Sequence, residues 1–109
     1  MSETTTGQKR KLSELIREGA KLRPQGFNNF FDADDDTGEV LCSCALGAAV
    51  EAAYGEPLAE LDGLDEFQRA MKKYCTMPSY EGLRNVVVRN DEEMQTREEI
   101  ADWLQSEGY

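Results

Sequence analysis

Eleven consecutive residues without a charge, Val40–Val50 (VLCSCALGAAV), lie inside the most acidic part of this chain. Between Pro24 and Arg69 the sequence contains eleven Asp and Glu residues and neither Lys nor Arg. Because hydrophobic residues make up only 39% of the chain, few other segments can supply a core. We therefore expect the uncharged run to be buried, and the acids around it to face water or a basic partner.

The uncharged run continues into a segment that is apolar on nearly every side. Residues 44–54 carry one charge, Glu51, and such a segment is typical of a helix at the centre of a fold. Ser43 is the residue that we expect to cap this helix. Residues 27–42 precede it and combine an aromatic run, an Asp-rich turn with Gly38, and a short apolar return. This order predicts a β-hairpin.

Helical spacing of apolar residues marks the segments on either side. It predicts a first helix over residues 8–22 and another from Leu64 to Tyr74. Residues 79–89 fit a helix or, because they contain three consecutive valines, a strand, and we favour the helix. Thr96 and Glu99 have the spacing of a capping box, which predicts the start of a last helix.

These elements together predict one α+β domain dominated by helices. About four helices would surround the central helix of residues 44–54, with a small hairpin at about residues 27–42 beside them. The domain is expected to span residues 8–109, after a disordered tail at residues 1–7. No apolar segment of signal-peptide or membrane-spanning length is present, and three cysteines, an odd number, suit reduced thiols. We therefore expect a cytoplasmic protein.

The net charge of −10 argues against two classes of partner. Nucleic-acid binding requires clustered Lys and Arg, and an anionic membrane surface also attracts basic residues. The absence of histidine removes Ser-His-Asp triads, HExxH zinc sites and histidine pH switches. No Gly-rich phosphate-binding loop is present either. The sequence therefore predicts a protein that is not an enzyme and has no cofactor.

The Asp-rich turn invites a comparison with calcium-binding loops. Asp32, Asp34 and Asp36 occupy positions 1, 3 and 5 of an EF-hand pattern, but Thr37 replaces the glycine of position 6 and Ser43 the glutamate of position 12. We therefore predict no metal site and interpret this segment as an acidic turn. The three aspartates remain candidate ligands for weak metal binding, which is a further alternative function.

Two short motifs resemble those of a known family. Residues 44–48 read CALGA, and Asn90-Asp91 is followed by Thr96 and Glu99. This order resembles an uncharacterised family of small bacterial and phage proteins, in which CALGA is followed by an Asn-Asp pair before a last helix. The resemblance covers most of the chain and implies an α-rich fold and a bacterial or phage origin. It implies no activity.

The acidity suggests a function that a small phage-type protein could perform. Carboxylates arranged on a rigid fold can imitate the regularly spaced phosphates of DNA. We therefore expect a protein-binding module, and as one form of it an inhibitor that presents carboxylates to a basic, nucleic-acid-binding surface of a host protein. The candidate contacts are Asp32, Asp34, Asp35, Asp36, Glu39, Glu51, Glu56, Glu60, Asp62, Asp65, Glu66, Asp91, Glu92 and Glu93.

An apolar interaction surface is the alternative function. The aromatic residues Phe27, Phe30 and Phe31, or the face of the last helix that carries Trp103, could anchor a protein partner or a second copy of this chain. Binding through such a surface would not depend on salt. Binding through the carboxylates would weaken as the salt concentration rises.

Overall fold

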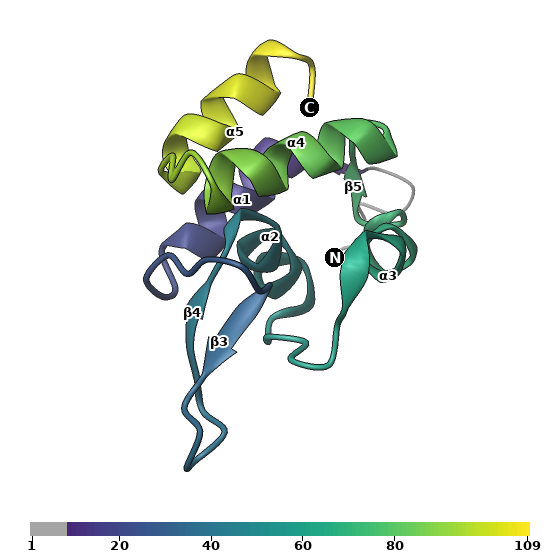
Figure 1. The fold of residues 1–109 in the computed structure, drawn as a ribbon. Coiled ribbons are helices and arrows are strands. Elements are labelled where there is room, and N and C mark those ends of the chain that lie inside the picture. Colours follow the sequence, from purple (N-terminus) through teal and green to yellow (C-terminus); the bar gives the residue numbers. More distant parts are fainter. Residues whose placement is uncertain (1–8) are drawn as a thin grey trace.

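The computed structural model describes residues 9–109, which form a body of helices from which one hairpin extends (Figure 1). This part of the chain contains five helices. They are α1 (Leu12–Ala20), α2 (Ala45–Tyr54), α3 (Gly63–Met71), α4 (Tyr80–Asp91) and α5 (Arg97–Ser106). The prediction of a helix-dominated α+β fold is therefore confirmed. The predicted tail at residues 1–7 and the predicted helix start at Gln8 lie outside the described residues.

Two short sheets accompany the helices. Strands β3 (Phe31–Ala33) and β4 (Val40–Ser43) pair in the antiparallel direction and form the projecting hairpin. Strands β2 (Arg10–Lys11) and β5 (Cys75–Thr76) pair in the parallel direction, with Arg10 opposite Cys75. The sequence analysis predicts the hairpin but not the parallel pair, because two-residue strands carry no periodicity that a sequence could show.

The core forms where α1 crosses α2. Every residue of α2 from Ala45 to Glu51 is buried. A methyl group added at Gly19 of α1 would overlap the carbonyl group of Ala48, so the two helix backbones can approach this closely only because Gly19 has no side chain. Helix α1 ends at Ala20, two residues earlier than predicted, and Leu22 is 55% exposed.

Helix α2 begins one residue later than expected. Cys44, and not Ser43, is the N-cap: its backbone is extended, and its Sγ accepts a hydrogen bond from the Gly47 N–H at 3.3 Å. Ser43 is instead the last residue of β4, and its Oγ accepts a hydrogen bond from Arg97. The expected cap is wrong because the strand continues through Ser43 before the chain turns into the helix.

The hairpin occupies less of residues 27–42 than predicted. Asn28 has a φ of 75°, in the left-handed region, so the chain bends before β3 begins at Phe31. The pairing register also shifts between Asp32 and Ala33, which indicates a β-bulge. The turn follows the prediction more closely, since Gly38 has a φ of 76°.

The helix favoured for residues 79–89 is present as α4, which begins at Tyr80. Ser79 caps α4 by accepting a hydrogen bond from the Gly82 N–H, and the helix buries Leu83, Val86 and Asn90. The consecutive valines are tolerated because burial of one helix face outweighs their modest helix propensity. At the start of α5 both hydrogen bonds of the predicted capping box are present.

Helix α5 and the residues after it hold α1 at both ends. The carbonyl oxygen of Tyr109 accepts hydrogen bonds from the backbone N–H and the Oγ of Ser13, in the first turn of α1. At the other end, Nη2 of Arg97 donates to the carbonyl oxygens of Ala20 and Arg23. Arg97 is only 8% exposed, and this burial lowers its pKa.

Candidate functional site

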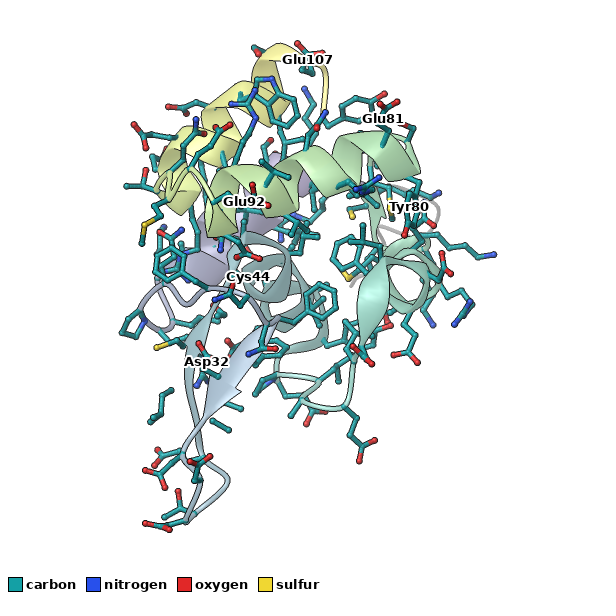
Figure 2. The ribbon with its side chains drawn as sticks, viewed as in Figure 1. Asp32, Cys44, Tyr80, Glu81, Glu92 and Glu107 are labelled. Carbon is teal, nitrogen blue, oxygen red and sulfur yellow. The ribbon has the colours of Figure 1, made fainter. Side chains whose placement is uncertain are left out.

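The hairpin presents a compact group of acids to solvent. Its tip and strands carry Asp32, Asp34, Asp35, Asp36 and Glu39, which we call the hairpin acids. Figure 2 shows Asp32 near the base of the hairpin and carboxylate oxygens gathered at its far end. Among residues 9–109 no Lys or Arg forms a salt bridge with any of the five. None of the five is therefore held in an ion pair by the described part of the chain.

Asp34 also organises the turn. Its Oδ1 accepts hydrogen bonds from the backbone N–H groups of Thr37 at 3.0 Å and Asp36 at 2.8 Å. These two donors lower the pKa of Asp34, so that it remains ionised well below neutral pH. The turn therefore holds at least one of its carboxylates in a fixed orientation.

Two of the three aspartates of the EF-hand comparison take part in local hydrogen bonds. Asp32 accepts a hydrogen bond from the side chain of Asn29, and Asp34 is occupied by its own turn. Within residues 9–109 no three Cys, Asp or Glu side chains converge as metal ligands would. We therefore take the alternative of metal binding no further.

Glu51 differs from the other acids of the middle block. It is 5% exposed, and its two carboxylate oxygens accept hydrogen bonds from Nε and Nη2 of Arg23 at 2.8 and 2.6 Å. This buried, two-point ion pair ties the loop after α1 to α2. We therefore remove Glu51 from the candidate contacts. In the described part of the chain, the ten other acids of residues 25–68 form no salt bridge.

A groove lies beside the base of the hairpin. Its volume is about 490 Å³, and it is bounded by residues 28–31, the start of α2, residues 59–64 and helix α4. Three acids line it, Asp62, Asp91 and Glu92, together with one base, Arg84. Its apolar lining is supplied by Phe30, Phe31, Leu46, Leu61, Leu64 and Val87. Figure 2 labels Cys44, Tyr80 and Glu92, which also line this groove.

Asn90 joins the three segments around one end of the groove. Its Oδ1 accepts hydrogen bonds from Nε2 of Gln25 at 2.9 Å and from the N–H of Ala45 at 3.1 Å. Its Nδ2 donates to the carbonyl oxygen of Gly26 at 3.0 Å and to Oδ1 of Asp91 at 2.7 Å. All four hydrogen-bonding positions of this amide are therefore used, and its side chain is 1% exposed.

The two sequence motifs meet at this point. The first helical N–H group after Cys44, that of Ala45, is bound by Asn90, and the neighbouring Asp91 accepts a hydrogen bond from the N–H of Asn28 at 2.8 Å. A methyl group at Gly47 would overlap the carbonyl group of Phe30. Gly47, Asn90 and Asp91 of the two motifs thus position the loop before β3.

The structure gathers some of the predicted contact residues and disperses others. Asp62, Asp91 and Glu92 come from two distant parts of the sequence and line the same groove. Glu66, in the first turn of α3, accepts a hydrogen bond from the N–H of Asp62. The remaining candidates are exposed outside both the hairpin and the groove lining: Glu56, Glu60, Asp65 and Glu93.

The polar residues that build the groove are not marked by any pattern in the sequence. Asn28, Arg84 and Asn90 have no charge pattern or periodicity that distinguishes them. Asn90 belongs to the Asn-Asp motif, but that motif indicated only a family resemblance and not where Asn90 lies in the fold. A buried amide with four partners is recognisable only after the chain has folded around it.

The aromatic candidates of the apolar alternative are partly used by the core. Phe30 stacks on Phe67 with ring centroids 6.0 Å apart, and both Phe30 and Phe31 pack against the core cluster. The guanidinium group of Arg89 lies 4.0 Å from the ring centroid of Trp103 and covers it. Neither place offers a broad apolar face.

The buried thiols are unreactive in this arrangement. Burial raises the pKa of Cys44 and of Cys75 to about 11, so both are protonated at neutral pH. Cys42 is half-buried in β4. The buried pair are therefore small core residues rather than nucleophiles.

Comparison of the chain with family models, with curated proteins and with solved structures found no match. None of the described helices is both long enough and apolar enough to cross a membrane.

Proposed function

We propose that this chain is an acidic protein-binding module whose hairpin acids contact a basic surface of a partner protein. One observation carries the proposal: five carboxylates stand on a hairpin that projects from the helical body, without a salt-bridge partner among residues 9–109. Unneutralised charges in a projecting element attract an oppositely charged surface over several ångströms.

The most specific partner is a protein surface that normally holds nucleic acid. Such a surface carries clustered Lys and Arg that neutralise phosphates, and carboxylates on a folded hairpin can occupy the same positions. Occupation would block the nucleic acid, so the module would act as an inhibitor. The resemblance of CALGA and Asn90-Asp91 to small bacterial and phage proteins favours a phage-type inhibitor of a host protein.

The pairing of other charges supports this assignment. Arg17 contacts Glu98 and Asp102, and Arg10 contacts Glu14 and Glu18, so these arginines neutralise acids outside the hairpin. The apolar alternative lacks comparable support, because Phe30 and Phe31 pack against the core and Arg89 covers Trp103.

The test compares the native protein with two variants of equal charge. In the first, the hairpin acids are neutralised as Asp32→Asn, Asp34→Asn, Asp35→Asn, Asp36→Asn and Glu39→Gln. The control variant neutralises five exposed acids elsewhere, as Glu56→Gln, Glu60→Gln, Asp65→Asn, Glu81→Gln and Glu107→Gln. Each variant carries five fewer negative charges, which changes the net charge from −10 to −5.

Each tagged protein is used to capture partners from a bacterial lysate at low and at high salt, and the partners are identified by mass spectrometry. We expect a nucleic-acid-binding protein to be retained by the native and control proteins at low salt, released at high salt, and not retained by the hairpin variant. Equal retention by the hairpin variant, or retention only of salt-resistant partners, would refute the proposal.

A further inference from the structure

We infer that the groove beside the hairpin binds one short segment of the partner protein, in which an apolar side chain lies next to Arg or Lys. The inference rests on the proposed function and adds a second, chemically different contact to it. The hairpin acids supply long-range attraction, whereas the groove would recognise a particular side-chain sequence.

The size of the groove suits a peptide segment of this kind. Its volume of about 490 Å³ lies within the range of about 300–1,000 Å³ that is usual for ligand pockets. Leu61 and Leu64 from one wall and Val87 from α4 provide apolar contacts for one aliphatic side chain. Phe31, another lining residue, is the first residue of β3, so the groove adjoins the base of the hairpin.

The charge of the lining indicates a cationic neighbour for that side chain. Asp62, Asp91 and Glu92 contribute three negative charges, and Arg84 contributes the one positive charge among the described lining residues. None of these four forms a salt bridge within residues 9–109. A guanidinium or ammonium group entering the groove would therefore meet an excess of carboxylate.

Asp91 is the residue best prepared for this contact. Its Oδ1 is held by the N–H of Asn28 and the Nδ2 of Asn90, and these two donors fix the plane of the carboxylate. Its Oδ2 receives no hydrogen bond from the described residues. One oxygen is thus anchored while the other remains for a donor from the partner.

The groove is also formed in advance. Asn90 bonds simultaneously to Gln25, Gly26, Ala45 and Asp91, which fixes the loop before β3 against α2 and α4. Binding therefore does not have to order this wall, and less of the interaction free energy is lost to conformational entropy.

Three synthetic pentapeptides, blocked at both ends, test the inference by two-dimensional NMR titration of the ¹⁵N-labelled protein. The first has the order Gly, Arg, Leu, Arg, Gly. The second replaces Leu by Ser, and the third replaces both Arg by Gln. We expect the first peptide to shift the amide signals of Asn28, Asn29, Gly63 and Asp91 in a saturable manner. Each of the other two should bind about tenfold more weakly or worse.

Two variants locate the binding. Asp62→Asn, Asp91→Asn and Glu92→Gln together should weaken binding of the first peptide about tenfold, and Asp91→Asn keeps an acceptor oxygen for the N–H groups that hold it. The matched control, Glu56→Gln, Glu60→Gln and Asp65→Asn, removes the same number of charges outside the lining. It should change the affinity by no more than about twofold.

The outcomes distinguish the groove from the hairpin. Signal changes confined to residues 32–39, equal responses to all three peptides, unchanged binding by the groove variant, or no binding of any peptide would each overturn the inference. Loss of partner capture by the hairpin variant would still support the proposed function in every one of these cases.

Discussion

Replacement of Asn90 by Ala provides the sharpest test of how the fold supports the groove. The change leaves the N–H of Ala45 and the carbonyl oxygen of Gly26 without their partner, and both residues are buried. Each unsatisfied buried group costs about 1–3 kcal/mol. Gln25 and Asp91, which lose the same partner, are half-buried and can turn towards water. We therefore expect a loss of about 2–6 kcal/mol from a total stability of about 5–15 kcal/mol.

Urea unfolding followed through the fluorescence of Trp103 measures this loss. For a slope of about 1.5 kcal/mol per molar urea, a loss of about 3 kcal/mol lowers the midpoint by about 2 M. Asn85→Ala is the matched control, because Asn85 is an exposed residue of the same helix. Alanine there should change the stability by only about 0.5 kcal/mol, in the stabilising direction.

A conservative variant separates hydrogen bonding from side-chain volume. Asn90→Asp keeps the shape and the acceptor oxygen, but it loses the donor to Gly26 and places a second carboxylate beside Asp91. Burial and the like charge of Asp91 raise the pKa of the introduced carboxyl group. The ionised carboxylate therefore destabilises the folded protein above that pKa, and protonation removes this destabilisation below it. If Asn90→Ala came within about 1 kcal/mol of Asn85→Ala, the assigned role of the amide would be wrong.

Three further predictions follow from the geometry. Gly47→Ala forces a methyl group into a backbone carbonyl of the loop before β3, so thermal unfolding should show a loss of at least about 2 kcal/mol. Iodoacetamide should modify Cys42 alone in the native protein, because Cys44 and Cys75 are buried. After denaturation, mass spectrometry should show that all three cysteines have reacted. Rapid labelling of Cys44 and Cys75 in the native protein would contradict their burial. Asp34 has a lowered pKa, so its ionised carboxylate stabilises the folded turn fully above the ordinary Asp pKa of about 3.9. This stabilisation is lost as the pH falls through the lower pKa of Asp34 in the folded protein. NMR titration should show its carboxyl group titrating below about 3.9.

The parts of the fold that depend on local patterns were predictable. The capping box of Thr96 and Glu99, the acidic turn and the helix over residues 79–89 rest on neighbouring residues, whose side chains interact in any context. The N-cap of α2 was not predictable in this way. Ser43 is the better intrinsic cap, but tertiary contacts with Arg97 retain it in β4, and Cys44 takes the capping position.

The candidate site likewise has one part that local sequence predicts and one part that depends on tertiary contacts. Contiguous acids made the hairpin visible in the sequence, because charge density along a chain requires no knowledge of the fold. The groove depends on residues about 30 positions apart, such as Asp62 and Glu92, whose approach is decided by the packing of α4 against α2 and α3. Glu51 shows the converse: its charge suggested a surface contact, and only the folded chain reveals its pairing with Arg23.

The attachment of α1 at both ends has a consequence for how the chain folds during synthesis. The N–H of Ser13, near the start of α1, donates to the carbonyl oxygen of Tyr109. The carbonyl oxygens of Ala20, the last residue of α1, and of Arg23, just after it, accept hydrogen bonds from Arg97. These partners emerge from the ribosome more than 70 residues after α1 itself. Helix α2 can cover part of the apolar side of α1 early, but the ends of α1 and the side that α5 covers remain exposed until almost all of residues 9–109 have been made. The attachment of both ends of α1 should then be a late event that follows the packing of α1 on α2.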